Sequence, residues 1–319
     1  MGGHSRLKQQ SHMRSAYNLY RGICLVAVAM QLVASPIFAQ QASKPATPPP
    51  APFDPAAHHL PTSANDLVRE VIGNQLKQEA DLAYMYHVRK ETPSGVQTKE
   101  VIETRDGSLS WVLTNNDAPL SDEERRKEDD KLQNILKSPE EQTKRRKDQK
   151  EDDDRTNRML QTMPDAFIYT YDGTEPAANR AGELVRLTFK PNPDFKPPDR
   201  ETQVYRGMEG QMLIDPVERH MVKIDAVLVR DVNFGWGIFG RLNKGGRFMV
   251  AQSRINKGRW DTTDMILDFT GKVLLFKRLR IKERQVATDF RPVPHNLSLE
   301  DGAQMLRQTA TQLAQKKQF

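Results

Sequence analysis

One glycine-rich stretch of this sequence matches a nucleotide-binding fingerprint. Gly235, Gly237 and Gly240 have the G-x-G-x-x-G spacing, which in a dinucleotide site leads from a strand into a helix whose N-terminus holds the pyrophosphate. The residues after Gly240 predict a turn and another strand instead. We therefore expect no nucleotide cofactor here and a wide hairpin loop. The apolar side chains of this loop are Trp236, Ile238 and Phe239. They either pack into the core or form an exposed tip that contacts lipid or a partner.

Residues that could act as nucleophiles, bases or metal ligands are few and scattered. Cys24 is the only cysteine, and no G-x-S-x-G sequence or Ser/His/Asp set is visible. His58 and His59 are adjacent with no carboxylate or thiol partner, so a solvated pair is expected there rather than a metal site. The sequence therefore predicts no metal site and no enzyme, with a hydrolase of unrecognised residues as an alternative. We expect surface or structural roles for three further histidines: His87, His220 and His295.

The sequence predicts antiparallel strands over much of the chain. Segments of roughly 8–12 residues, rich in β-branched and aromatic side chains and bounded by Gly, Pro, Asn or Asp, run through residues 201–291. The first is expected to begin at Glu201, and Thr270-Gly271 is expected to be a turn. No gap in this region is long enough for a crossover helix, so parallel pairing is not expected. Further strands are predicted at 82–90, 96–104, 108–114, 166–172 and 183–190.

Helical patterns occur in three places. One begins at Ser63, and a closing helix is expected at 298–316, each with a single apolar stripe. Between them, residues 121–162 are rich in charged residues of both signs, with 13 acidic and 12 basic residues between 121 and 158. Capping sequences at Ser121 and Ser138 divide this segment into two helices. We interpret it as a solvated helical hairpin inserted in the domain.

The N-terminal residues predict export. Four basic residues precede an apolar segment at 22–39, which is typical of a cleaved secretory signal peptide covering residues 1–39. An uncleaved membrane anchor is the alternative. Met13 would give a more usual basic region than Met1, so either methionine could be the start. Localisation in the periplasm, or secretion, follows from the cleaved signal.

The remaining chain is nearly neutral. Residues 1–39 contain four of the 48 basic residues and none of the 42 acidic ones, so the rest carries a formal charge of +2. Such a balance gives no reason to expect nucleic-acid binding. Residues 40–61 are rich in proline and alanine and predict a disordered linker. Residues 62–319 are expected to form a single domain.

The predicted order is a signal peptide, a helix, three strands, the charged helical segment and a long run of antiparallel strands. Within this order stand Tyr84, Tyr86, 210–215, 221–224, Trp260, 271–276 and 287–291. This order and these residues resemble the lipoprotein-carrier (LolA-like) superfamily of the bacterial envelope. The resemblance implies an α+β half-barrel: a strongly curved antiparallel sheet of about 8–11 strands, with an apolar concave face covered by helices.

A groove of this kind would bind acyl chains by apolar burial, worth roughly 0.8 kcal/mol per methylene. Aromatic residues at alternating strand positions are the candidate lining, with an ordinary filled core as the alternative for each. These candidates are Tyr84, Tyr86, Trp111, Phe167 and Tyr169.

We therefore predict a periplasmic, non-enzymatic binding protein that carries or senses a lipid or an acylated protein and is at most peripheral to the membrane. The alternative is an interaction or sensor module with a filled core, which docks an envelope protein through residues 121–162 or 232–246.

Overall fold

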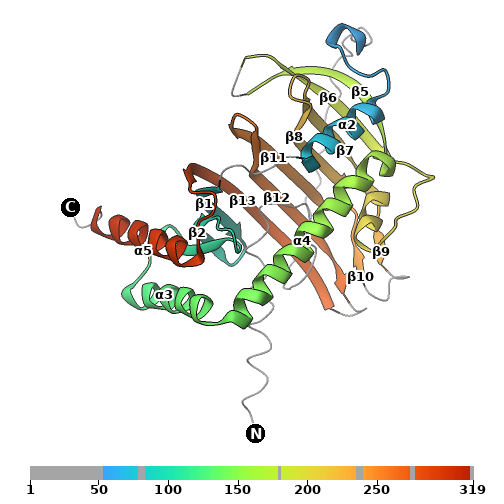
Figure 1. The fold of residues 1–319 in the computed structure, drawn as a ribbon. Coiled ribbons are helices and arrows are strands. Elements are labelled where there is room, and N and C mark those ends of the chain that lie inside the picture. The colour runs from blue at the N-terminus through green and yellow to red at the C-terminus, as the bar shows by residue number, and fades with distance from the viewer. Residues whose placement is uncertain (1–52, 78–82, 179–180, 235–239, 274–276, 317–319) are drawn as a thin grey trace, which may run out of the picture.

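The computed structural model describes residues 53–77, 83–178, 181–234, 240–273 and 277–316 (Figure 1). The predicted signal peptide and most of the predicted linker lie outside these residues and stay predictions. The last part of that linker is packed against the domain: Leu60 is buried in the main core, and Phe53 stacks on His58 and contacts Tyr171. None of the described helices is both long and apolar enough to cross a membrane.

One open antiparallel sheet forms the body of the molecule, with 13 strands among the described residues. Eleven of them follow the order β4-β3-β2-β1-β13-β12-β11-β8-β7-β6-β5, and β10 joins β9 to β12. The predicted α+β half-barrel class is thus confirmed, with two strands more than the upper expectation. The strands are β1 (Ala83–Thr92), β2 (Gly95–Ile102), β3 (Leu109–Asn115), β4 (Ala118–Pro119), β5 (Phe167–Pro176), β6 (Glu183–Pro191), β7 (Met208–Asp215), β8 (His220–Leu228), β9 (Val232–Phe234), β10 (Gly240–Leu242), β11 (Arg247–Asn256), β12 (Arg259–Val273) and β13 (Lys277–Val293).

The charged segment connects the two edges of this sheet. Helices α3 (Asp122–Lys137) and α4 (Pro139–Ala166) lead from edge strand β4 to edge strand β5. With 28 residues, α4 is about 42 Å long at 1.5 Å per residue, and it crosses the sheet diagonally (Figure 1). The predicted caps are confirmed: Ser121 forms a capping box with Glu124, and the Ser138 side chain accepts a hydrogen bond at the start of α4. The second helix extends four residues beyond the predicted end at 162. The inserted segment therefore connects the two edges of the sheet across the domain.

Helices cover both faces of the sheet. We call the face that α2 (Ala64–Lys77) and α4 cover the inner face, and the opposite one the outer face. The larger apolar core lies on the inner face and includes residues from α2, α4 and strands β5 to β8. A second core lies where α5 (Leu299–Lys316) and α3 pack against β1, β2 and β3. The resemblance implied that helices cover one face only. In the structure, α3 and α5 cover the other face and form the second core with it.

Two predicted strand boundaries are wrong. Residues 201–207 form a 3-10 helix, η3 (Glu201–Gly207), rather than the start of a strand. The Asp199 carboxylate holds its first turn by accepting hydrogen bonds from the Thr202 backbone nitrogen at 2.9 Å and from its hydroxyl at 2.8 Å. In addition, Thr270 and Gly271 are not a turn, because β12 continues through them to Val273 and pairs with β10 and β13.

Candidate ligand-binding cavity

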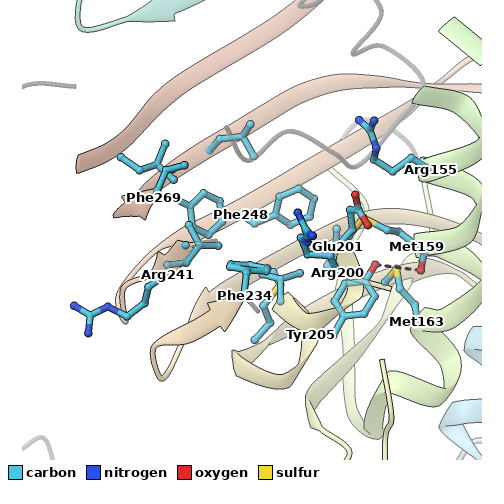
Figure 2. A pocket seen from close by; sticks show the side chains of 18 of the residues that line it. Arg155, Met159, Met163, Arg200, Glu201, Tyr205, Phe234, Arg241, Phe248 and Phe269 are labelled. Carbon is cyan, nitrogen blue, oxygen red and sulfur yellow. Dashed lines mark hydrogen bonds between the residues drawn. The ribbon is translucent and has the colours of Figure 1, made fainter. Parts of the chain in front are cut away.

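An apolar cavity of about 420 Å³ lies between the inner face of the sheet, α4 and η3. This volume is within the range of roughly 300–1,000 Å³ found for small-molecule sites. Figure 2 shows side chains from α4, η3 and several strands converging on it. Of the 21 described residues that line it, 14 are Met, Phe, Val, Leu or Ile. The cavity can therefore bury hydrocarbon.

One side of the cavity is a single stripe of α4. Arg155, Met159 and Met163 all line it, and their spacing of four residues places them on the same helix face. Met159 and Met163 are buried, whereas Arg155 is half-buried nearer the middle of the helix. The part of α4 that lines the cavity thus changes from polar at Arg155 to apolar at Met159 and Met163. Methionine side chains adapt readily to ligands of different shape.

The sheet supplies the opposite wall from inner-face positions of neighbouring strands. Leu267 and Phe269 are two residues apart on β12 and therefore point to the same side. They are joined by Ile224 on β8, Phe248 on β11 and Leu279 on β13. These four strands are adjacent in the sheet, so the wall is continuous.

Three aromatic rings hold the end of the cavity near β5. The ring centroid of Phe167 lies 4.8 Å from that of Phe189 and 5.1 Å from that of Tyr205. The Tyr205 hydroxyl donates a hydrogen bond of 3.1 Å to the Met159 carbonyl oxygen (Figure 2). This bond satisfies a buried polar group and fixes η3 against α4.

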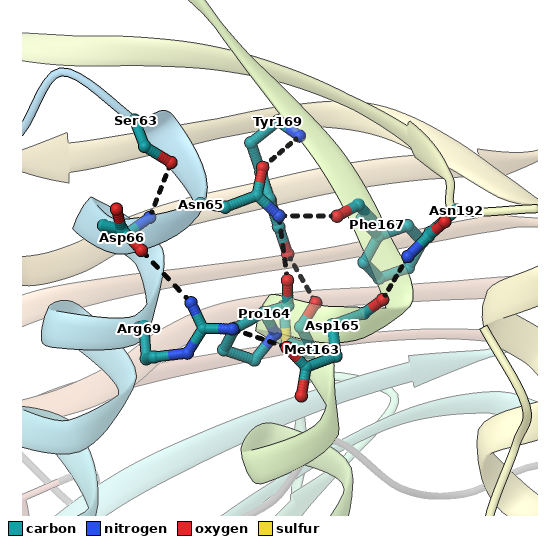
Figure 3. Close-up of polar contacts among 10 residues, drawn as sticks. All are labelled: Ser63, Asn65, Asp66, Arg69, Met163, Pro164, Asp165, Phe167, Tyr169 and Asn192. Carbon is teal, nitrogen blue, oxygen red and sulfur yellow. Dashed lines mark hydrogen bonds and ion pairs between the residues drawn. The ribbon is translucent and has the colours of Figure 1, made fainter. Parts of the chain in front are cut away.

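A side chain of α2 secures the end of α4. The Asn65 amide nitrogen donates hydrogen bonds to the carbonyl oxygens of Pro164 at 2.9 Å and Phe167 at 2.8 Å (Figure 3). Its amide oxygen accepts a hydrogen bond of 3.1 Å from the Tyr169 backbone nitrogen. The last carbonyl groups of a helix have no partner within it, so Asn65 satisfies one of them and one at the start of β5. Asn65 thereby positions both Met163 and Phe167 at the cavity.

Charged side chains stand at the border of this apolar space. Arg155 lies 3.0 Å from Asp152, and Arg241 lies 3.4 Å from Asp231. Arg200 and Lys272, both exposed, and Glu201 also line the cavity. The described lining residues include no His, Cys, Ser, Thr or Asp. What this arrangement offers is burial of apolar groups with a mainly cationic border.

The predicted lining residues are dispersed. Phe167 lines the cavity, and Tyr169 packs beside it in the same core, with its hydroxyl donating a 3.2 Å hydrogen bond to the Met163 carbonyl oxygen. Trp111 lies in the second core, under α5 and α3. It is two residues from Leu109 on β3, so both side chains point to the side that α5 and α3 cover. Trp236, Ile238 and Phe239 lie outside the described residues, and their role stays a prediction.

Tyr84 and Tyr86 form a separate cluster on the inner face. Val88 lies on the same side of β1 as these tyrosines and pairs with Ala287 of β13. Gln285 lies on the same side of β13 as Ala287 and pairs with Met265, which belongs to the main core on the inner face. The Tyr86 ring stacks on Phe290 at 4.9 Å. Neither tyrosine lines the cavity described above.

A buried ion cluster adjoins Tyr84. The Arg259 guanidinium lies 2.7 Å from Glu103, 2.7 Å from Asp261 and 4.7 Å from the centre of the Tyr84 ring. Burial raises the pKa of the Asp261 carboxyl, against the opposing effect of Arg259. This cluster ties β12 to Glu103, which directly follows β2, and a buried pair of this kind is costly to break.

Two of the histidines, His87 and His220, have partners in the sheet. His87 lies 2.8 Å from Asp289 and 3.5 Å from Glu100. His220 lies 2.8 Å from Gln252 and stacks on Trp260, and burial lowers the pKa of its imidazole. Within the described ranges, no group of three or more His, Cys, Asp or Glu could hold a metal ion.

Sequence reasoning missed most of the cavity. Met159 and Met163 are the apolar positions that end the charged segment, and their four-residue spacing was a usable signal. Phe269 and Leu279 alternate with polar residues on their strands, as inner-face positions do, whereas Phe248 lies in an apolar run. Alternation does not distinguish a residue that lines a cavity from one that fills a core, however, so these residues could not be selected.

Comparisons with known proteins give distant structural similarities. No protein-family model matches the chain, and no curated protein matches it. The chain is similar to a solved DUF1329 family protein from Desulfovibrio piger, with 13% identity, a TM-score of 0.28, and coverage of 77% of this chain and 96% of that one. It is also similar to an outer membrane lipoprotein-sorting protein domain from Vibrio parahaemolyticus, with 8% identity, a TM-score of 0.25, and coverage of 75% and 97%. Because both TM-scores are low, the proposals below rest on the geometry of this chain.

Proposed function

We propose that this protein binds an acyl chain of a lipid or an acylated protein in the inner-face cavity, without catalysing a reaction. The observation that carries the proposal is the cavity itself, with about 420 Å³ between α4, η3 and the sheet and a lining that is mainly apolar. Export by the predicted signal peptide would place this activity in the bacterial envelope. There it would carry the ligand or sense it.

The energetics of such a site are those of simple burial. Each methylene moved from water into the cavity contributes roughly 0.8 kcal/mol, so ten would contribute roughly 8 kcal/mol before the cost of ordering the chain. Hydrocarbon has no directional groups, and the methionines of α4 can adjust to it. We therefore expect the site to accept acyl chains of several lengths.

The border of the cavity fits the polar end of such a ligand. Arg155 and Arg200 border the apolar lining, together with Glu201. A bound amphiphile would therefore bury its chain against Met163 and leave its head group among charged side chains.

The test is a titration of the delipidated, purified protein with dodecanoate that carries a fluorophore. Val204 lines the cavity from η3, and Val204→Trp would fill part of it without adding a charge. Val227→Trp is the matched control, since Val227 is 42% exposed and does not line the cavity. We expect Val204→Trp to weaken binding by about tenfold or more, which corresponds to about 1.4 kcal/mol, and Val227→Trp to bind as the unmodified protein does.

Native mass spectrometry of the protein from its own envelope fraction gives a second measurement. Retained acyl species that are depleted in Val204→Trp would support the proposal. If the unmodified protein neither retains acyl species nor binds the probe, the proposal fails. Equal binding by Val204→Trp and Val227→Trp would place any acyl site elsewhere.

A further inference from the structure

We propose that the outer surface of the β12–β13 hairpin docks on an anionic membrane, through attraction to phospholipid head groups. We define the basic patch as Lys272, Arg278, Arg280 and Lys282. The proposal does not depend on what occupies the cavity, although the two sites adjoin.

Strand register brings these side chains together. Lys272 on β12 pairs directly with Arg278 on β13, and Thr270 and Asp268 pair with Arg280 and Lys282. Leu279 lines the cavity on the inner face, so the residues that alternate with it point to the outer face. All four basic side chains are exposed. They form a cationic array on neighbouring strands.

The cations of the basic patch have no carboxylate partner within the described part of the protein. None of the four residues forms an ion pair there, and Asp268 is the one acidic residue in register with them. Two other cations on the same strands or next to them are paired, in contrast: Arg247 lies 2.8 Å from Asp225, and Arg284 lies 3.0 Å from Asp264.

The lysines of α4 provide a second contrast. Lys147 lies 3.8 Å from Glu151 and Lys150 lies 2.8 Å from Asp154, each at a spacing of four residues along the helix. That surface is highly charged but locally neutral. With a formal charge of only +2 beyond residue 39, the chain has no bulk excess of cations to scatter over its surface. The basic patch is therefore a local concentration of charge.

The position of the patch points to a membrane rather than to a soluble polyanion. Lys272 and Val273 line the cavity from the same end of β12, and Leu279 lines it from β13. An anionic surface attracted to the patch would therefore lie beside the border of the apolar cavity. A hydrocarbon ligand could then pass between membrane and cavity with little exposure to water.

The test is co-sedimentation with phosphatidylcholine vesicles, with and without phosphatidylglycerol, at several salt concentrations. The patch variant is Arg278→Gln, Arg280→Gln and Lys282→Gln, and the matched control is Lys190→Gln, Lys196→Gln and Lys257→Gln, which removes three exposed lysines outside the patch. Near a membrane surface each cation contributes roughly a fivefold gain in binding, so the patch variant should bind about 100-fold more weakly. Binding should fall with salt and should need phosphatidylglycerol.

Three outcomes would overturn the proposal. The first is equal loss of binding in the patch variant and the control. The second is equal binding to vesicles with and without phosphatidylglycerol. The third is failure to bind vesicles at low salt while retaining binding to heparin, which would assign the patch to a soluble polyanion. Near-ultraviolet circular dichroism checks the fold, and the single variant Arg280→Gln, expected to show about a fivefold loss, serves if the triple variant does not fold. The acyl probe is absent from this assay, so its result is separate from that of the cavity titration.

Discussion

Gly271 on β12 lies so close to Arg241 on β10 that a β-carbon added to it would stand 2.1 Å from the Arg241 carbonyl oxygen. Even a close carbon–oxygen contact between strands is about 3.3 Å, so no other residue fits without moving a strand. Gly271 pairs with Leu242, a cavity residue. The glycine that resembles a turn residue in the sequence instead allows β10 to join the cavity wall.

Substitution of this glycine should destabilise the protein. We expect Gly271→Ala to lower the free energy of unfolding by about 2–3 kcal/mol, because β10 or β12 must shift. Gly73→Ala is the control: a β-carbon there meets nothing within 4 Å, and alanine in a helix interior should stabilise by about 0.5–1 kcal/mol. Urea unfolding measures both. Equal effects of the two substitutions would contradict the assignment of Gly271 to a close approach of strands.

Asn65 should matter both for stability and for the cavity. Asn65→Ala removes three hydrogen bonds at the junction of α4 and β5, and we expect a loss of about 2–3 kcal/mol since two carbonyl groups lose their partner. The affinity for labelled dodecanoate should fall as well, because Met163 and Phe167 would be less firmly placed. Asn74→Ala on the same helix is the control, with a single exposed contact of 3.4 Å, and should change stability by less than about 0.5 kcal/mol. A normal stability of Asn65→Ala would show that the junction does not depend on this side chain.

Lys99 should make stability depend on pH. Burial, followed by the nearby charge of Lys90, lowers the pKa of Lys99 from 10.5 to about 8. The native state therefore binds fewer protons than the unfolded chain between these two values, so stability from this group rises with pH across that window. Below pH 8 the residue costs on the order of 3 kcal/mol.

Replacement of Lys99 by methionine should therefore stabilise the protein at pH 7, and the gain should shrink as the pH rises from 8 toward 10.5. Urea unfolding of Lys99→Met and of the unmodified protein at several pH values gives this difference. The exposed Lys257→Met serves as the control and should show no such trend. A gain that is constant with pH would mean that packing, rather than the charge, is responsible.

Much of the secondary structure was predictable because it depends on neighbours in the sequence. The caps at Ser121 and Ser138 define both charged helices, and their hydrogen bonds are local. Alternation of apolar residues located most strands, since it reports which side of a strand is buried. Glu201 and Gly271 are the exceptions, because their conformations depend on Asp199 capping η3 and on the approach of β10.

Where these elements meet depends on contacts between distant segments. The sequence shows that residues 121–162 are helical and charged, but not that they join the two edges of the sheet and cross its inner face. It likewise determined that Trp111 and Phe167 occupy buried strand positions, but not that one packs under α5 while the other lines a cavity. Local hydrogen bonds and periodicity select helix, strand and buried side, whereas the partner across each face is chosen by packing between segments far apart in the chain.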